Sequence, residues 1–338
     1  MEQVQVRQPN LVANWRHVMR TCNPPKELDP VSRWLVLTRA CVQPMTLTAA
    51  AFAGLLAVRA PRFNLGLWLL ASIGIVLAHA SNNLMNDLFD LEVGSDTRDY
   101  PRALYAPQAV LSGLITRRGL IRAALVINLT DLVILAVLAL LRGPLVIFFA
   151  LAGLLISVGY AAPPLRLKQH GLGEPGVFLT WGPLMIGGTY YSATGHLSWL
   201  VLLASVPYAL LTTSVLMGKH IDKIPWDSKL GIGTLPVQMG EGAARRLTEG
   251  MMIAFYVAVV ALVAARGLPL LSLLSLLGLF RLGQVLGYFH RPTPKEPPPD
   301  YPVWPLWYAA GAFVHTRRAG ALLVLGMALG ALFPIGAG

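Results

Sequence analysis

The sequence predicts an all-α polytopic membrane protein with about nine transmembrane helices in one bundle. Of the 338 residues, 55% are hydrophobic and only 13% are charged, whereas a soluble globular domain carries about 25% charged residues. Apolar runs recur along the whole length, and many approach the roughly 20 residues that a helix needs to cross the hydrocarbon core. The mean hydropathy of +0.59 agrees with this class and excludes an ordinary soluble domain.

Nine apolar segments have the composition of membrane spans. Several contain Gly or Pro, which membrane helices tolerate. We expect spans at 34–58, 64–86, 120–141, 144–162, 175–193, 197–218, 249–265, 267–288 and 319–335. No long linker divides the chain, so we expect a cytoplasmic N-terminal segment over 1–33 and a single transmembrane domain over 34–338. The N-terminal segment is polar and lacks the apolar core of a cleaved signal peptide.

Lys and Arg residues are divided unequally between the two sides of this predicted bundle. Most of the 27 lie in the N-terminal segment and in the loops that share its side, and the opposite side carries only Arg59, Arg62, Arg142 and Arg266. Loops rich in Lys and Arg stay in the cytoplasm. We therefore expect the N-terminus and the acidic clusters described below to be cytoplasmic, in the cytoplasmic membrane of a bacterium or archaeon.

The net charge of +11 is spread over several short loops. This distribution favours some attraction to anionic lipid headgroups, and no nucleic-acid partner is expected. The only two cysteines, Cys22 and Cys41, show neither metal-site spacing nor an obvious partner, so we expect no disulfide framework.

A first acidic cluster ends the second predicted span, in the sequence N-L-M-N-D-L-F-D at 83–90. Asp87 and Asp90 are three residues apart, so a helix presents both carboxylates on one face, with Asn83 on the same side. Gly94 then allows a turn that can bring Asp96 back toward the pair. Carboxylates beside hydrocarbon are costly and usually mark function. The alternative interpretation is a solvated acidic loop that caps the span.

A second acidic cluster, at 219–229, follows the sixth predicted span and mixes Asp222 and Asp227 with three lysines. Carboxylates can hold a metal ion, while lysines meet phosphate oxygens as point charges. Oxygen ligands without Cys or clustered His favour Mg²⁺. Taken alone, an ordinary charged loop explains this cluster equally well. The segment 160–174 can add further cations on the same side, or can simply carry cytoplasmic positive charge.

Five residues of the predicted spans have ordinary structural interpretations, which we prefer to functional ones. His79 lies one to two turns before the first acidic cluster and is interpreted as a buried, hydrogen-bonded histidine rather than a catalytic one. Phe178, Trp181, Met185 and Tyr190 can line a substrate tunnel or shield a cation, but ordinary helix packing explains each of them better.

The chain resembles the UbiA superfamily of intramembrane prenyltransferases across nearly its whole length, and three motifs in order carry this resemblance. The first is N-D-L-F-D-L-E-V-G-S-D at 86–96, followed by an arginine at Arg98 or Arg102. The second is Y-x-x-P-P-x-x-L-K-x-x-G-L-G-E at 160–174. The third is K-x-x-D followed by D-x-K-x-G-I-x-T-L, at 219–235. The Gly94 spacing and the L-K-x-x-G-L-G-E run are most similar to the branch that makes menaquinone and related quinones.

Two departures from the family pattern affect the implied metal ligands. Gly94 stands where many members have the last aspartate of the first motif, and Asp96 is the available substitute. The second aspartate motif is usually D-x-x-x-D, but here Lys223 stands at its first position and Asp222 lies one residue earlier. Asp227 is therefore the better candidate.

The resemblance implies a UbiA-like bundle that binds a prenyl diphosphate with its tail in a cavity open toward lipid. It implies Mg²⁺ ligands at Asp87, Asp90, Asp96, Asp222 and Asp227. Its implied catalytic set is Asp87, Asp90, Asp227 and Lys219. The implied substrate-binding residues are Asn83, Asn86, Arg39, Arg98, Arg102, Tyr160, Lys168, His220 and Lys223. Metal ions and cations would stabilise the departing diphosphate. An aromatic acceptor, such as a dihydroxynaphthoate-like ring, would then attack the allylic cation.

Two other functions stay open from the sequence. In a UbiA-type terpene cyclase, the same metal site would ionise the donor and the cation would cyclise without an acceptor. A transporter also carries intramembrane charges, but it places them near the midplane, usually with inverted repeats. Both acidic clusters here lie at one predicted face, which favours the enzymes.

Overall fold

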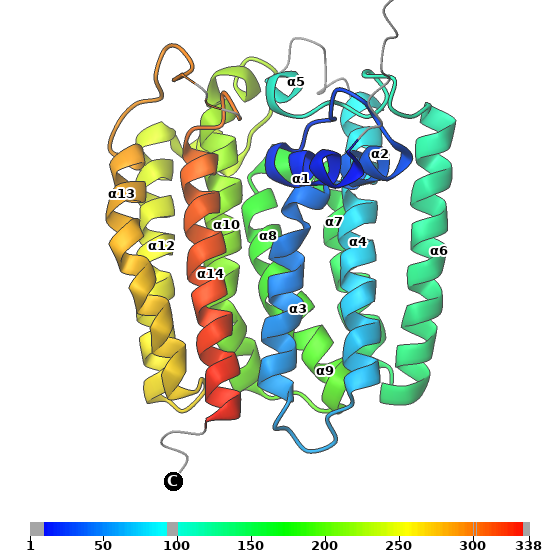
Figure 1. The fold of residues 1–338 in the computed structure, drawn as a ribbon, viewed down its shortest axis with the longest axis vertical. Coiled ribbons are helices and arrows are strands. Elements are labelled where there is room, and N and C mark those ends of the chain that lie inside the picture. Colours follow the sequence, from blue (N-terminus) through cyan, green and yellow to red (C-terminus); the bar gives the residue numbers. More distant parts are fainter. Residues whose placement is uncertain (1–9, 93–100, 300, 302, 334–338) are drawn as a thin grey trace, which may run out of the picture.

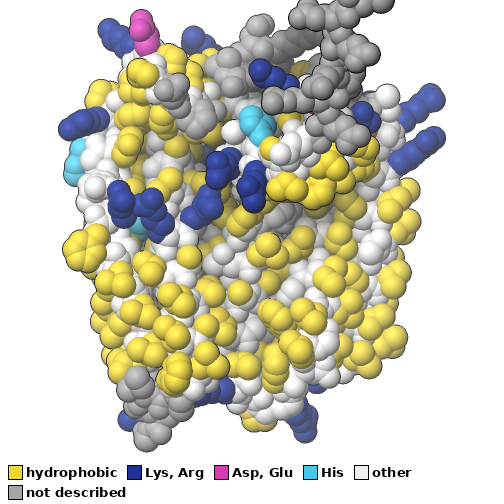
Figure 2. All heavy atoms as spheres, viewed as in Figure 1, with side chains coloured by type: hydrophobic (Ala, Val, Ile, Leu, Met, Phe, Trp, Pro, Cys, Tyr) yellow, Lys and Arg dark blue, Asp and Glu magenta, His cyan; other side chains and the backbone are white. Residues whose placement is uncertain are grey.

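Residues 10–92, 101–299, 301 and 303–333 are described by the structure, which is a computed structural model. Among them every regular element is a helix, and most of the long helices run side by side (Figure 1). This confirms the predicted all-α class. Figure 2 shows one face that is largely hydrophobic through its middle and lower part, with Lys and Arg side chains nearer the upper part and the lower edge. The chain is an integral membrane protein.

Five helices of 24 or more residues frame the bundle: α4 (Leu65–Glu92), α6 (Arg117–Arg142), α10 (Trp199–Asp227), α12 (Glu241–Ala264) and α14 (Tyr308–Leu332). α10 packs against α12 and α14, whereas α4 packs against α6. α3 (Gln43–Ala57) contacts both α4 and α14 and so joins the two groups. The shorter elements are α5 (Arg102–Tyr105), η2 (Leu167–His170), α11 (Leu235–Met239), η4 (Leu270–Gly278) and α13 (Leu279–Phe289).

Seven stretches of the described chain are long and apolar enough to cross a membrane. They are Ala40–Ala57, Leu65–Glu92, Arg117–Arg142, Trp199–Asp227, Glu241–Ala264, Leu270–Phe289 and Tyr308–Leu332. The other two predicted spans fall on α7 (Leu145–Ala161), which has 17 residues, and on a composite of α8 (Gly173–Leu179), η3 (Thr180–Gly187) and α9 (Gly188–Thr194). Helices therefore occupy all nine predicted positions, but helix length and composition do not confirm nine spans.

The composite helix changes its winding in the middle, because η3 is a π-helix that contains Pro183. Small residues let this segment approach its neighbours. An added Cβ at Gly182 would lie only 2.7 Å from Cβ of Ala209, and one at Gly188 would lie 3.1 Å from Phe149. Such close backbone approach is typical of helix packing in membranes, and π-turns are frequent at functional sites.

The first predicted span, 34–58, is broken at its start. α2 (Pro30–Leu37) ends before Arg39, whose φ of 51° lies in the left-handed region, and the chain resumes through η1 (Ala40–Val42) into α3. Non-glycine residues seldom adopt this conformation. The apolar span itself therefore begins later than predicted, at Ala40, and the break turns the chain so that Arg39 reaches α4.

α1 (Leu11–Thr21) and α2 lie across one end of the bundle rather than along it (Figure 1). Asp29 joins the two helices. It caps α2 by accepting from the Ser32 amide at 2.9 Å, and it also accepts from Nε1 of Trp15 at 3.3 Å. Hydrogen bonds from the Ser32 hydroxyl and amide hold the pKa of Asp29 well below its usual range.

Cys22 and Cys41 form a disulfide, with Cα atoms 5.5 Å apart. The expectation that they have no partner is therefore wrong. Cys22 ends α1 with a left-handed φ of 60°, and this turn brings α1 beside η1, where Cys41 lies. Neither the turn nor the helix contact can be read from a separation of 19 residues.

The main core lies where α10, α12 and α14 meet. Tyr208, Met217, Phe255, Tyr308 and Leu323 are all nearly inaccessible there. Lipid is as apolar as these side chains, so close packing, rather than transfer out of water, holds the helices together. This core fixes the end of α10, which carries half of the candidate site.

Candidate active site

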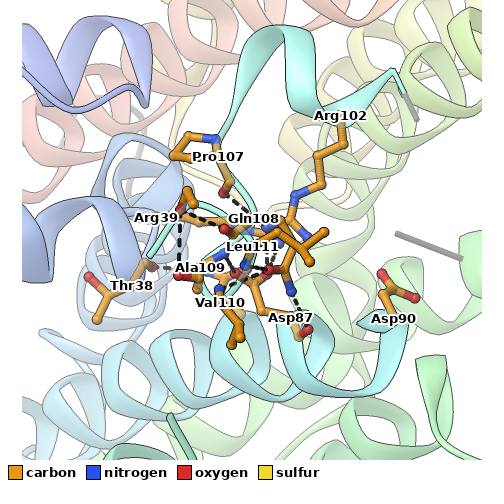
Figure 3. A network of polar contacts seen from close by, with 12 residues as sticks. Thr38, Arg39, Asp87, Asp90, Arg102, Pro107, Gln108, Ala109, Val110 and Leu111 are labelled. Carbon is orange, nitrogen blue, oxygen red and sulfur yellow. Dashed lines mark hydrogen bonds and ion pairs between the residues drawn. The ribbon is translucent and has the colours of Figure 1, made fainter. Parts of the chain in front are cut away.

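Asp87 is the centre of a buried polar network near the end of α4 (Figure 3). Its side chain is 3% exposed, and Oδ1 accepts from Nη2 of Arg102 at 2.6 Å and from Nη2 of Arg39. Oδ2 accepts from the Ala109 amide at 3.4 Å. Two guanidinium groups on one carboxylate make a strong, charge-assisted arrangement. Asp87 is thus not a solvated loop residue.

The chain before and after α4 folds back to build this network. Asn83 donates to the Thr38 carbonyl at 3.0 Å, which holds the Arg39 turn against α4. Gln108 donates to the Asp87 carbonyl at 2.8 Å. Its own Oε1 accepts from the amides of Val110 and Leu111. Gln108 was not predicted as a site residue, because nothing in the sequence around it shows that this segment folds back onto α4.

Asp90 links the first motif to the second. It lies one helical turn beyond Asp87, and its Oδ1 accepts from Nζ of Lys168 at 2.6 Å. Lys168 is 6% exposed and belongs to η2, which follows the left-handed residue Arg166. This ion pair joins segments that are 78 residues apart in sequence.

A buried hydrogen-bonded chain connects the second motif to the third. Nδ1 of His220 bonds to Oε1 of Glu174 at 2.6 Å, and Nε2 of His220 bonds to the Tyr160 hydroxyl at 3.3 Å. Glu174 and His220 are each 1% exposed. The sequence named Tyr160 and His220 as site residues but missed the role of Glu174, although Glu174 ends the second motif.

The second acidic cluster is helical, not a loop. α10 continues through Asp227, so Lys219, Lys223 and Asp227 follow one another at four-residue spacing on one face. Nζ of Lys223 lies 3.7 Å from Oδ2 of Asp227. Lys219 makes no hydrogen bond or ion pair with any residue that the structure describes. It is therefore an ammonium group that lacks a counter-ion in this part of the chain.

The acidic clusters meet at one end of the bundle. Lys223 of the second cluster is near enough to Asp90 of the first for their charges to interact. The charges of Arg39, Arg102, Lys168 and Lys223 also act on Lys219. Among the described residues, these five cations lie near four carboxylates, which are Asp87, Asp90, Glu174 and Asp227. The surplus of positive charge suits an anionic ligand.

Asp222 has a different surrounding. Its two carboxylate oxygens accept from the backbone amides of Tyr308 and Ala309, at 2.9 Å each. These are the first residues of α14, so Asp222 satisfies amides that a helix start leaves without partners. This explains why α14 begins at Tyr308 and not at the predicted 319. Asp222 is therefore not among the Mg²⁺ ligands that we propose.

The carboxylates of this site fit a hard divalent cation only if a bound substrate supplies further oxygen ligands. In the part of the chain that the structure describes, no three His, Cys, Asp or Glu side chains lie close enough to hold an ion by themselves. Asp96 and Arg98 lie outside the described residues. Mg²⁺ typically takes one or two carboxylates and completes its shell with substrate phosphates and water. Asp87, Asp90 and Asp227 fit that pattern.

A cavity of about 1000 Å³ extends from this polar end into the bundle. Arg39, Asp87, Arg102, Tyr160 and Lys219 line its polar end, where Asn83 and Asn86 also contribute. Asp90, Lys168, Lys223 and Asp227 are not among the described lining residues. The deeper lining is mostly apolar and includes Phe149, Trp181 and Met185. It also reaches Leu125, Leu132 and Val314, which are exposed on the outer surface of the bundle.

One carboxylate of the deeper lining was missed from the sequence. Asp131 lies in the middle of α6, and its Oδ1 is enclosed without a hydrogen bond to any described residue. The signal was present, because a carboxylate inside a predicted span is costly and often functional. It was overlooked because no neighbouring residue completes a motif.

The UbiA prenyltransferase family matches residues 47–308 of the sequence. The chain belongs to this family. It is 30% identical over 227 residues to 1,4-dihydroxy-2-naphthoate octaprenyltransferase of Escherichia coli (strain K12), a match that covers 65% of this chain and 73% of the relative. Two other curated relatives are matched over only about half of their own length, 54% and 53%.

Solved structures of other UbiA homologues share the fold. The homologue from Aeropyrum pernix K1 superposes with a TM-score of 0.63 at 20% identity, covering 84% of this chain and 97% of that chain. The homologue from Archaeoglobus fulgidus bound to GPP and Mg²⁺ gives a TM-score of 0.56 at 13% identity, covering 86% and 99%. At these identities the likeness establishes the UbiA bundle and nothing finer.

Proposed function

We propose that this protein is a Mg²⁺-dependent intramembrane prenyltransferase that moves a prenyl group from its diphosphate to an aromatic acceptor. The observation that carries this proposal is Lys219, a cavity-lining ammonium group without a partner among the described residues. The charges of four further cations act on it, and two of these cations, Arg39 and Arg102, line the polar end of the same largely apolar cavity. A multiply charged head with a hydrocarbon tail fits both parts at once.

The metal proposal rests on the carboxylates. Asp87, Asp90 and Asp227 would hold Mg²⁺ together with diphosphate oxygens, as the hard donor set favours. The Archaeoglobus fulgidus homologue was solved with GPP and Mg²⁺, which supports Mg²⁺ as the ion proposed here. When bound, the ion neutralises charge on the departing diphosphate.

The chain's own residues would do the remaining work. Arg39 and Arg102 hold Asp87, Lys168 holds Asp90, and each cation can turn to a diphosphate oxygen as charge develops there. The apolar lining keeps water from the allylic cation, which water would quench. Exposed lining residues such as Leu132 and Val314 give the prenyl tail a lateral route from lipid.

Family membership favours this enzyme over a transporter. The Escherichia coli relative is a naphthoate octaprenyltransferase, which supports transfer to a dihydroxynaphthoate-like acceptor over the cyclase alternative. We further propose that the site faces the cytoplasm, because most Lys and Arg residues lie on that predicted side.

Metal removal tests the reaction class. The purified protein is supplied with prenyl diphosphates of ten to forty carbons and 1,4-dihydroxy-2-naphthoate, and prenylated product and released diphosphate are measured. We expect transfer to fall at least about 100-fold in chelator and to return with Mg²⁺. Full turnover in chelator contradicts the scheme. A cyclic hydrocarbon formed with donor alone identifies the cyclase instead.

Lys219→Met tests the diphosphate site. The substitution keeps most of the side chain's length but removes its charge, so we expect the KM for the donor to rise at least about tenfold, equivalent to about 1.4 kcal/mol of binding. Lys229→Met is the matched control, since Lys229 is exposed just beyond the same helix. Equal effects of the two substitutions would show that only overall charge matters.

A further inference from the structure

His79 is placed to contact a ligand in the cavity. It lies on α4, lines the cavity and is 6% exposed. Nδ1 bonds to Oγ1 of Thr46 at 2.7 Å. Nε2 makes no hydrogen bond to a described residue, and it is not among the fully enclosed polar atoms. The expected buried, hydrogen-bonded histidine is therefore confirmed for one ring nitrogen, while the other is open to the cavity.

The distance along α4 between His79 and Asp87 matches the combined size of the reacting groups. His79 is eight residues before Asp87, which is about 12 Å along a helix axis. A diphosphate at Asp87, the first carbon of a prenyl chain and one aromatic ring can fill that interval. The ring of Trp181 stands edge-on to the imidazole, with centroids 5.1 Å apart, and Trp181 also lines the cavity.

We propose that His79 is the catalytic base that takes a hydroxyl proton from the aromatic acceptor, with Thr46 as its positioning residue. The inference rests on the proposed transferase function and adds an acceptor site to it. The tautomer that donates from Nδ1 to Thr46 leaves the Nε2 lone pair facing the cavity.

In the proposed step, His79 acts on the hydroxyl group of the acceptor. Nε2 takes the hydroxyl proton, and the O–H electron pair stays on the acceptor oxygen. A pair of ring π electrons forms the bond to the first prenyl carbon, whose bond to oxygen breaks with its electron pair leaving on diphosphate. The substituted ring carbon then loses its own proton to diphosphate or water, and the imidazolium returns a proton to the oxygen. One proton leaves per transfer.

The chain supplies a matched control in His315. It is buried like His79, at 1% exposed, and bonds through Nε2 to the Tyr256 hydroxyl at 2.9 Å. It does not line the cavity among the described residues. His315→Gln and His79→Gln therefore each remove a buried imidazole, and only the second faces the proposed acceptor.

The test compares transfer in the two variants, with Mg²⁺, donor and 1,4-dihydroxy-2-naphthoate. We expect His79→Gln to lower kcat at least about 100-fold, the usual effect of a general base, with the donor KM changed less than threefold. His315→Gln should change kcat less than threefold. A loss below threefold in His79→Gln overturns the proposal.

A second test varies the acidity of the acceptor hydroxyl, which distinguishes a catalytic base from a residue with only a structural role. A fluorinated acceptor has a more acidic hydroxyl and depends less on a base to remove its proton. The loss of kcat in His79→Gln should therefore be at least about tenfold smaller with this acceptor. An equal defect with both acceptors overturns the catalytic role. If His79→Gln does not fold, the same comparison is made with Thr46→Val, for which we expect a smaller loss of kcat, about fivefold to tenfold.

A wild-type protein that shows no Mg²⁺-dependent transfer would refute the proposed function itself. That result is distinct from both outcomes of the His79→Gln test.

Discussion

Asp87→Asn is expected to abolish prenyl transfer, with a loss of at least about 1000-fold. The carboxylate is a proposed Mg²⁺ ligand, and it carries the negative charge that two guanidinium groups share. Losing several kcal/mol of charge stabilisation corresponds to three or more factors of ten in rate. Breaking a buried ion pair also leaves Arg39 and Arg102 without their shared partner, which costs about 3–5 kcal/mol of stability. Transfer rate and thermal midpoint in detergent measure the two effects.

Glu92→Gln provides the matched control for this prediction. Glu92 is the last residue of the same helix and pairs with Arg117, but its side chain is 37% exposed, against 3% for Asp87. Exposed pairs contribute about 0–1 kcal/mol. We expect both transfer and stability to stay near the wild-type values. An Asp87→Asn protein that keeps a tenth of the wild-type rate would remove Asp87 from the proposed metal site.

Gly326→Ala is expected to have the largest effect on stability. A Cβ at this position would lie 2.2 Å from the Leu271 carbonyl oxygen and 2.9 Å from Cα of Ser272. Both neighbours are backbone atoms of η4, so no side chain can rotate away, and α14 must separate from η4. Overpacking costs about 1–3 kcal/mol even where side chains can adjust. We expect a loss of at least about 3 kcal/mol, seen as a lower thermal midpoint and reduced yield of monodisperse protein.

Gly250→Ala on α12 controls for the change of residue type. No atom lies within 4 Å of a Cβ added there, and alanine favours a helix over glycine by about 1 kcal/mol. Its thermal midpoint should equal or exceed the wild-type value. Similar losses in both variants would mean that the contact between α14 and η4 does not limit the stability of the bundle.

The structural class of this protein and the helix face of its first motif could both be predicted from the amino-acid sequence. Apolar runs near the length of a span predict helices in lipid, because only an internally bonded backbone survives there. Three-residue spacing places Asp87 and Asp90 on one helix face whatever surrounds them. These are local properties, and the helices indeed fall at the nine predicted positions.

Only the tertiary structure decided which groups face one another. The partners of Asp87 come from a break at Arg39 and from a segment that follows the first motif, and Lys168 reaches Asp90 across 78 residues. Asp222 was grouped with Asp227 by sequence, yet it holds the start of α14. The accessible nitrogen of His79 and the Cys22–Cys41 disulfide likewise could not be predicted from the sequence. The physical reason is that charge pairing, burial and access to a cavity depend on distances between segments far apart along the chain, whereas local patterns specify only how each segment folds.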